Sequence, residues 1–337
     1  MPPLSTSTAA GRRRAGLIIA ALGTAALAAF ALALVVGSVP VDMATAWRAL
    51  TGAAAEPEAA VVRELRLPRA VAAFATGGLL ALAGALMQVL LRNPLADPYV
   101  LGISGGSAVA ALSALLAGLT AWIAPAAFVG ASLSTVLVFG LARAGGGQGN
   151  WAPIRLLLTG VVVAAGWGAL TAMLLTLSPD AQVKGMLFWL LGDLSAATLG
   201  VPALAVLALA LAVAWSIGRD LNLVARGDDA ARALGVAVGR ITLTAHAVAA
   251  LATAVAVATA GTVGFVGLLA PHALRLLIGN DQRLLLPAAV LAGGTLLLLA
   301  DTLARTVVAP LQLPVGVLTA LIGVPVFLLL LARKGAR

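Results

Sequence analysis

The sequence predicts an all-α, polytopic membrane protein with about ten transmembrane helices. Its 337 residues are 62% hydrophobic and only 10% charged, which is too little polar surface to coat a water-soluble globule. Long runs of Leu, Ala and Val end at Gly, Pro and Arg, whereas the residue-by-residue alternation of a membrane β-barrel is absent.

A helix that crosses a bilayer needs about 20 mainly apolar residues. The chain offers ten such segments: 15–37, 68–91, 99–117, 121–143, 154–177, 198–217, 240–260, 262–278, 284–304 and 314–332. The first is too long for a typical signal-peptide core, so we interpret it as an anchored span. The sequence is thus divided into a tail at 1–14, one transmembrane domain at 15–332 with a polar loop at 218–239, and a tail at 333–337.

The basic residues predict the orientation. With the N-terminus inside and ten crossings, the cytoplasmic connections hold fifteen of the 21 Lys and Arg, as the positive-inside rule requires. Both tails are therefore predicted to be cytoplasmic. The net charge of +9 indicates topology rather than nucleic-acid binding, because no soluble face is large enough. There is no cysteine, and His246 and His272 have no neighbour at the spacing of metal ligands, so no metal site is expected.

One polar interruption follows the second predicted span. The segment 92–98 contains Pro94, Pro98, Asn93 and opposite charges, which cannot lie unpaired in hydrocarbon. We expect it at the membrane surface or against a protein-lined cavity, where a transport route begins.

Two polar connections carry signals of short helices. Residues 180–191 indicate either an interfacial helix, with Phe188 and Trp189 at headgroup level, or a plain re-entry segment. Residues 227–235 begin with acidic side chains and end with glycine, which predicts a two-turn helix. A helix this short is unstable alone, so either its own membrane domain or a docked partner must hold it.

Several blocks of the chain, in order, resemble the permease subunit of type II ABC importers, which move iron-siderophore, haem and cobalamin. The blocks are Arg66-Leu67-Pro68-Arg69, Gly84-Ala85-Leu86-Met87-Gln88, Arg92-Asn93-Pro94-Leu95-Ala96-Asp97-Pro98, Leu101-Gly102-Ile103-Ser104-Gly105-Gly106, Phe188-Trp189-Leu190-Leu191-Gly192, Gly227 to Gly235, Gly264 to His272, Ala300 to Arg305 and Leu313-Pro314-Val315-Gly316. The resemblance runs from about residue 60 to the C-terminus.

The resemblance implies a subunit of the bacterial inner membrane that pairs with a second copy as a homodimer. It also implies a periplasmic binding protein that delivers cargo and two cytoplasmic ATPase subunits that drive transport. The chain itself has no phosphate-binding Gly-x-x-x-x-Gly-Lys-Ser/Thr loop, and no lysine follows its cluster at 145–149. We therefore expect no enzyme activity and no cofactor here, with ATP and Mg²⁺ on the partner.

The resemblance also implies roles for individual residues. The coupling helix that contacts the ATPase corresponds to Gly227, Asp228, Asp229, Ala230, Ala231, Arg232, Ala233, Leu234 and Gly235. Cations for docking the binding protein correspond to Arg66, Arg69 and Arg305, with lipid-headgroup anchoring as the alternative. The cytoplasmic gate corresponds to Asn93, Pro94 and Leu95, and the loop 145–150 faces a second gate.

Spans five, eight and ten are expected to line the pathway. The candidates are small, aliphatic or weakly polar: Gly160, Gly166, Trp167, Gly168, Thr171, Met173, Gly323 and Val324. Such a lining binds cargo weakly, which suits a conduit. Haem or an iron-siderophore is the expected cargo, with cobalamin next. No residue of the sequence distinguishes among these three cargoes.

The alternative function is an ion-coupled secondary transporter. Such a protein needs an ionisable group buried in mid-span. The acidic residues here cluster at the ends of the predicted spans, and only Asp301 is placed to reach inward.

Overall fold

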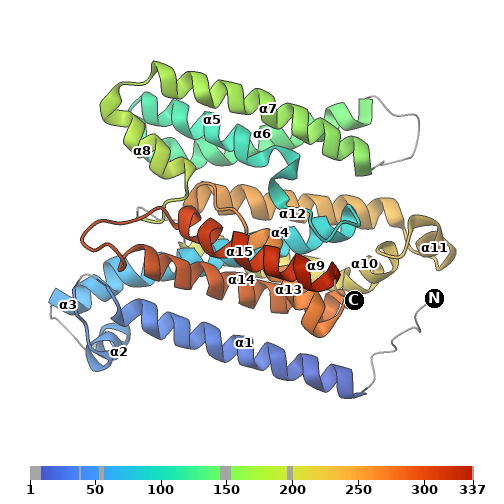
Figure 1. Cartoon of the computed structure of the whole chain (residues 1–337), viewed down its shortest axis with the longest axis horizontal. Helices are drawn as coiled ribbons and strands as arrows, with labels where there is room; N and C mark the ends of the chain where they lie inside the picture. Colours follow the sequence, from blue (N-terminus) through green and yellow to red (C-terminus); the bar gives the residue numbers. More distant parts are fainter. Residues whose placement is uncertain (1–8, 38, 53–56, 145–152, 196–199, 336–337) are drawn as a thin grey trace.

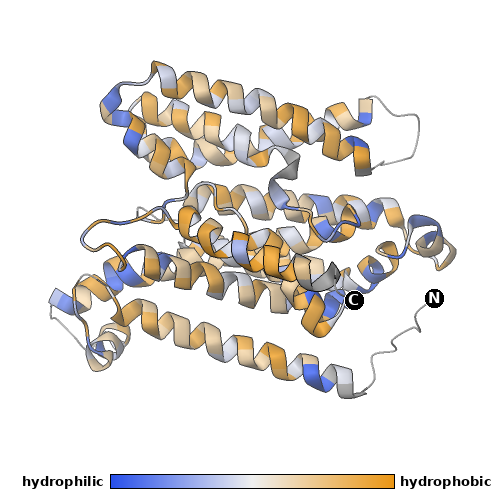
Figure 2. Cartoon of the chain, in the orientation of Figure 1, coloured by the Kyte–Doolittle hydropathy of each residue, from blue (hydrophilic) through white to orange (hydrophobic). Residues whose placement is uncertain are grey.

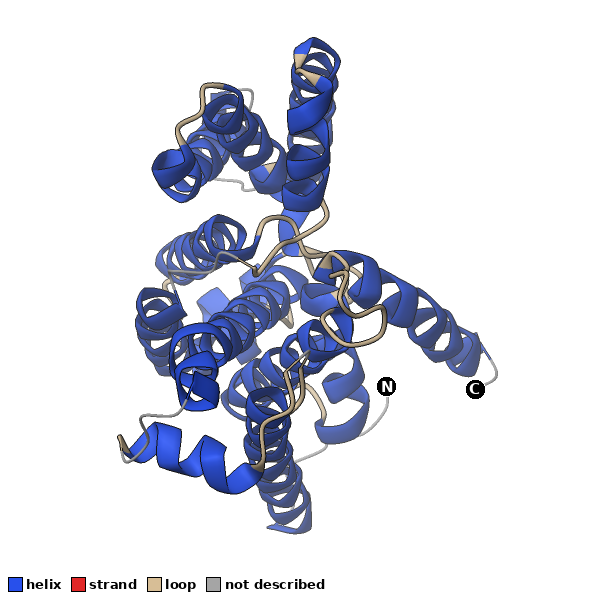
Figure 3. Cartoon of the chain, turned by 90° about the vertical axis from the view of Figure 1, so that its left-hand side faces the viewer, coloured by secondary structure: helices blue, strands red, loops and turns tan. Residues whose placement is uncertain are grey.

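The computed structural model describes residues 9–37, 39–52, 57–144, 153–195 and 200–335. This described part is largely helical and contains no strand (Figure 3). The longer helices are α1 (Ala9–Val35), α4 (Leu67–Leu90), α5 (Ile103–Leu116), α6 (Ile123–Ala144), α7 (Pro153–Leu177), α9 (Gly200–Ser216), α12 (Val238–Ala260), α13 (Val266–Ile278), α14 (Gln282–Ala304) and α15 (Val315–Gly335). The shorter ones are α2 (Met43–Thr51), α3 (Pro57–Ala60), α8 (Asp180–Leu190), α10 (Gly218–Val224), α11 (Asp228–Ala233), the π-helix η1 (Val61–Arg66) and the 3-10 helices η2 (Pro98–Leu101) and η3 (Thr120–Trp122).

The helix lengths confirm the predicted class of a polytopic helical membrane protein. Within the described residues, six helices are long and apolar enough to cross a membrane. Helices α9 and α10, with a bend of 59° between them, make a seventh if the pair is one span. Three further apolar stretches are shorter: α5, α13 and Val315–Leu330 of α15. These elements fall on the ten predicted segments.

The helices lie roughly side by side, with α10 and α11 at one end and α2, α3 and α8 at the other (Figure 1). We call these the α11 end and the α3 end. Helix α1 begins and α15 ends at the α11 end. Hydrophobic residues cover the helix shafts and hydrophilic residues gather toward the two ends (Figure 2). This distribution is the one that a bilayer requires.

Helix α4 forms the centre of the larger helix group. It packs against α9, α12, α13 and α14, and its span is 89% buried. Glycines let its backbone approach its neighbours: a Cβ added to Gly84 would lie 1.8 Å from the carbonyl oxygen of Gly267 on α13. Small residues of this kind permit close helix packing where lipid gives no hydrophobic drive.

Helices α5, α6 and α7 form a second group, which joins the first mainly through α12 (Figure 1). Helix α7 packs on α5 and α6, and only 11% of its span is buried. Most of α7 is therefore left for lipid or another chain.

Several predicted span starts were displaced by four residues or more, among them those of the second and eighth spans. The second span begins earlier than residue 68, because the helix continues unbroken from Pro57 through η1 to Leu90. Pro68 is tolerated because it stands at the start of α4, where η1 has already changed the hydrogen-bond register. The eighth span begins at Val266 rather than 262, since Phe265 takes a positive φ of 67°. The predicted short helix at 180–191 is confirmed as α8.

Candidate functional site

The short helix α11 lies at the end of the bundle, just after the bend between α9 and α10 (Figure 1). Gly227 has φ 126° and Gly235 has φ 82°, so glycine bounds the helix on both sides, in backbone conformations that other residues rarely adopt. The helix predicted at 227–235 is thus present, with its regular part at Asp228–Ala233.

The membrane domain itself holds α11. Asp228 forms an ion pair with Arg92, which follows α4, and the same guanidinium donates to the carbonyl of Val224 at 3.4 Å. Ala231 is fully buried, and its carbonyl accepts from the backbone N–H of Val236 at 3.0 Å. No local pattern in the sequence predicts Arg92 as the partner of Asp228, because the pair joins segments that are 136 residues apart.

Arg92 itself has φ 46°, an uncommon backbone conformation for a residue other than glycine. The predicted gate residues follow it in an exposed turn. The side-chain oxygen of Asn93 accepts from the backbone N–H of Leu95 at 2.9 Å. The backbone carbonyl of Asn93 accepts from the backbone N–H of Ala96 at 3.0 Å. The proposed gate is therefore a compact turn next to the residue that binds α11. The loop 145–150 lies outside the described residues.

A cluster of three arginines marks the α3 end. Arg66 is only 4% exposed and donates to the carbonyls of Leu34, Val35 and Val39. Arg69 forms a salt bridge of 2.8 Å with Asp301, and Arg305 approaches the same carboxylate at 3.5 Å.

These contacts show what the arginines do within the chain. Arg66 fixes the segment after α1, while Arg69 and Arg305 neutralise Asp301, which is 1% exposed. Asp301 is therefore a paired carboxylate, so the structure does not favour the secondary-transporter alternative, for which an ionisable group buried in mid-span is needed. Docking of a binding protein by the three arginines remains a prediction.

The predicted pathway residues on α7 face two directions. Gly160 is buried, and Trp167 donates from Nε1 to the hydroxyl of Ser134 on α6 at 2.9 Å. The ring also lies against Gly105 of α5, so Gly160 and Trp167 are packing residues within the chain. Gly166 and Met173 are exposed, and Met173 retains half of its surface, while Thr171 is half-buried.

Two hydrogen bonds join the segments that precede the two short helices α5 and α13. The hydroxyl of Tyr99 in η2 donates to the carbonyl of Val263 at 3.1 Å and accepts from the backbone N–H of Val263 at 3.0 Å. Tyr99 is the only tyrosine of the chain, and no local pattern in the sequence predicts its contact with Val263. The Tyr99 hydroxyl therefore provides hydrogen-bond partners for both backbone groups of Val263, a residue that belongs to no helix.

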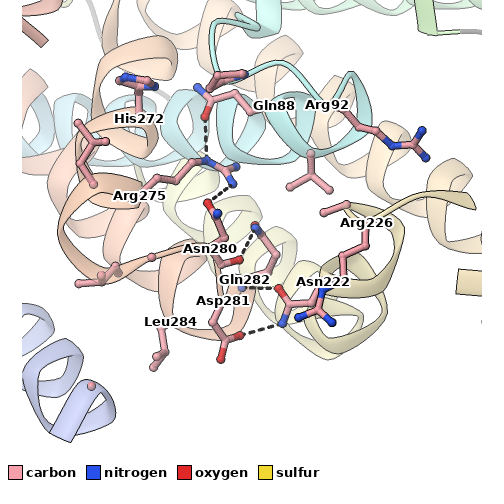
Figure 4. Close-up of a pocket in the computed structure, with 17 residues that line it drawn as sticks. Gln88, Arg92, Asn222, Arg226, His272, Arg275, Asn280, Asp281, Gln282 and Leu284 are labelled. Atoms are coloured by element: carbon pink, nitrogen blue, oxygen red, sulfur yellow. Dashed lines mark hydrogen bonds between the residues drawn. The ribbon is translucent and has the colours of Figure 1, made fainter. Parts of the chain in front are cut away.

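A cavity of about 1100 Å³ opens near the α11 end (Figure 4). Helices α1, α4, α10, α13 and α14 and their connections line it. Its polar lining includes Gln88, Arg92, Asn222, Arg226, His272, Arg275, Asn280, Asp281 and Gln282. The cavity could not be predicted from the sequence, because its walls come from segments that are distant along the chain.

The comparisons with known proteins agree with this architecture. Residues 25–333 match the FecCD transport family. The chain is 39% identical to the hemin transport system permease protein HmuU of Yersinia pestis, covering 94% of this chain and 93% of that protein. It is 40% identical to the Fe(3+) dicitrate transport system permease protein FecD of Escherichia coli, covering 92% and 96%.

A cobalamin import system permease protein, BtuC of Halobacterium salinarum, is also 40% identical, covering 86% of this chain and 80% of that protein. Among solved structures, a metal-chelate type ABC transporter in an inward-facing conformation superposes with a TM-score of 0.80 at 27% identity, covering 94% of this chain and 99% of the other. A match over nearly the whole length, together with the shared helix arrangement, shows that the chain belongs to the FecCD transport family of ABC importer permeases.

Proposed function

We propose that two copies of this chain form the membrane pathway of an ATP-driven importer in the bacterial inner membrane. A periplasmic protein delivers a metal chelate, and two cytoplasmic ATPase subunits supply the energy. Haem or an iron-siderophore is the proposed cargo, with cobalamin next. The relatives named for hemin, Fe(3+) dicitrate and cobalamin transport support this range of cargo.

The observation that carries this proposal is the position of α11. Asp228 in its first turn is bound to Arg92, and Asn93, Pro94 and Leu95 follow Arg92 directly. An ATPase that displaces α11 therefore pulls on the gate turn through one ion pair. Such a rigid-body transfer needs no nucleotide site in this chain.

The exposed side of α7 offers a surface against which the second copy packs in this proposal. Val162 is 72% exposed, Val161 is 58% exposed and Met173 is 50% exposed, and they lie along a helix that has few contacts within its own chain. We restrict the proposed pathway lining on α7 to Gly166, Thr171 and Met173, since Gly160 and Trp167 pack on α5 and α6.

The α3 end is the proposed docking side for the binding protein, because it is opposite to α11 (Figure 1). Arg69 keeps 13% of its side-chain surface and Arg305 keeps 10%, so a docked acidic residue reaches only the edge of this cluster. Such a contact affects the encounter rate and its salt dependence more than the affinity.

Uptake by proteoliposomes tests the proposal. The complete transporter is reconstituted with its ATPase and binding protein, and accumulation of a ferric chelate or haem is measured. We expect vanadate to abolish accumulation and a protonophore to leave it unchanged. Uphill accumulation by the chain without any ATPase, or its loss on adding a protonophore alone, contradicts the proposal.

A further inference from the structure

The cavity at the α11 end has the chemistry of an anion site (Figure 4). Its lining combines neutral amides with arginines, and its one acidic residue, Asp281, is already engaged. That carboxylate accepts from the backbone N–H of Arg283 at 3.1 Å and from the side-chain amide of Asn222 at 2.9 Å. Asp281 therefore holds the start of α14 in place and leaves Arg226 and Arg275 without a carboxylate.

Arg275 of α13 supplies the central positive charge. Its Nε donates to the side-chain oxygen of Gln88 at 3.1 Å, and one Nη donates to the carbonyl of Ala85 at 3.1 Å. The other Nη lies 3.5 Å from the side-chain oxygen of Asn280. All these acceptors are neutral. A half-buried guanidinium that meets only neutral acceptors is stabilised by an added anion.

A second cation lines the same cavity. The side chain of Arg226 forms no hydrogen bond or ion pair with any residue that the structure describes. Arg92 also lines the cavity, but its guanidinium turns away from Arg275 (Figure 4) and pairs with Asp228. The charge offered to a ligand therefore comes from Arg226 and Arg275, which lie on separate elements and are brought together by the fold.

Part of the wall is apolar. Leu276, Ile278 and Leu284 line the cavity beside the arginines, and Leu276 keeps 48% of its surface exposed. An inorganic ion needs no such surface, whereas an amphiphile with a charged head and apolar chains does. The location fits as well, because the cavity lies near the helix ends, at the depth where headgroups meet a membrane protein.

We propose that this cavity binds a phosphate group, supplied by the headgroup of an anionic phospholipid or by free phosphate. Arg275 and Arg226 bind the phosphate oxygens, and the amide side chains of Gln88 and Asn280 hold Arg275 in position. The bound group bridges α13 to the turn between α10 and α11, the elements that meet at this cavity. The site thus makes the conformation of the α11 end sensitive to the phosphate-bearing molecules around it.

Binding to the purified full-length chain in detergent tests the proposal, with phosphatidylglycerol, phosphatidylcholine and inorganic phosphate as probes. We expect phosphatidylglycerol to bind more tightly than phosphatidylcholine. Arg226→Gln and Arg275→Gln should each weaken phosphatidylglycerol binding about tenfold, the usual effect of removing a charged hydrogen-bond donor. Arg219→Gln is the matched control, because Arg219 is an exposed arginine of α10 outside the cavity lining.

Arg226→Gln keeps the test decisive if Arg275→Gln fails to fold, because the side chain of Arg226 forms no hydrogen bond or ion pair within the described residues. Competition by inorganic phosphate separates the two sources: displacement of phosphatidylglycerol identifies free phosphate as a ligand, and persistence of the lipid identifies the headgroup. The proposal is overturned if phosphatidylcholine binds equally well, if Arg226→Gln leaves binding unchanged, or if Arg219→Gln weakens binding as much as the cavity variants.

Discussion

Arg92 and Asp228 form an ion pair that connects the turn after α4 to the first turn of α11. Both side chains are partly exposed, at 42% and 38%, so the pair contributes little to the stability of the fold. Its importance lies in what it joins. The residue on one side precedes the proposed gate, and the residue on the other begins the proposed ATPase contact.

The first prediction concerns this pair. Asp228→Asn should lower the free energy of unfolding by no more than about 1 kcal/mol, as expected for an exposed ion pair. Uptake by the assembled transporter should nevertheless fall strongly while ATP hydrolysis continues, because movement of α11 no longer reaches the gate turn. Both rates are measured on the same proteoliposomes.

Asp220→Asn serves as the control, since Asp220 lies on the neighbouring helix α10 and forms no ion pair within the described residues. Exchanging the charges, with Arg92→Asp and Asp228→Arg together, should restore part of the coupling. Equal uptake in Asp228→Asn and Asp220→Asn would show that the pair transmits nothing.

The second prediction concerns Asp301, whose carboxylate is 1% exposed between Arg69 and Arg305. Asp301→Asn should destabilise the protein by about 3–5 kcal/mol, because it leaves two cations without their common counterion. Denaturant unfolding in detergent measures the change. Asp229→Asn, at a fully exposed carboxylate, should change stability by less than about 0.5 kcal/mol.

Adding Arg305→Gln to Asp301→Asn should recover part of the lost stability, since one uncompensated charge is then removed. If the single and double variants unfold alike, the cluster is held together by contacts other than charge.

The third prediction concerns the crossing of α4 and α13. Gly84→Ala would place a Cβ 1.8 Å from the carbonyl oxygen of Gly267, so the two helices must separate. We expect a loss of about 1–3 kcal/mol or more in thermal or denaturant unfolding. Gly23→Ala on α1, where nothing lies within 4 Å of the added methyl, should be neutral or slightly stabilising. A neutral Gly84→Ala would be incompatible with the observed crossing.

The fourth prediction concerns the hydroxyl of Tyr99. Tyr99→Phe removes both hydrogen bonds to the buried backbone of Val263 and should cost about 1–3 kcal/mol. Hydrogen exchange should become faster in 261–265 and stay unchanged in α14. Thr24→Val is a suitable control, because that hydroxyl only bonds to carbonyls of its own exposed helix. Unaltered exchange at Val263 would mean that the loop is held by other contacts.

Local signals explain what could be predicted at the candidate site. Gly227 and Gly235 delimit α11 because positive φ angles favour glycine, and this preference is visible in a sequence. The face of α7 was less predictable. The sequence predicted Trp167 as a pathway residue, but its indole N–H donates a hydrogen bond to the hydroxyl of Ser134. An indole N–H inside a protein favours such a partner.

The α3 end shows a similar division. The arginines at 66, 69 and 305 are recognisable from the pattern around them, but their burial is not. The carbonyls that accept from Arg66 belong to the end of α1 and to Val39 just after it, and the partner of Arg69 comes from α14, 232 residues away. Only the packed chain shows that these cations are already neutralised or hydrogen-bonded within the protein.

The sequence by itself determined the membrane class, the approximate spans and the short helix α11, because apolar length and glycine placement act over a few neighbouring residues. The tertiary structure decided the pairing of Arg92 with Asp228, the neutralisation of Asp301 and the gathering of Arg226 and Arg275 around one cavity. Each of these depends on side chains that approach one another only after the helices pack. The role of a charged side chain in a membrane protein is decided by the partner that it contacts there.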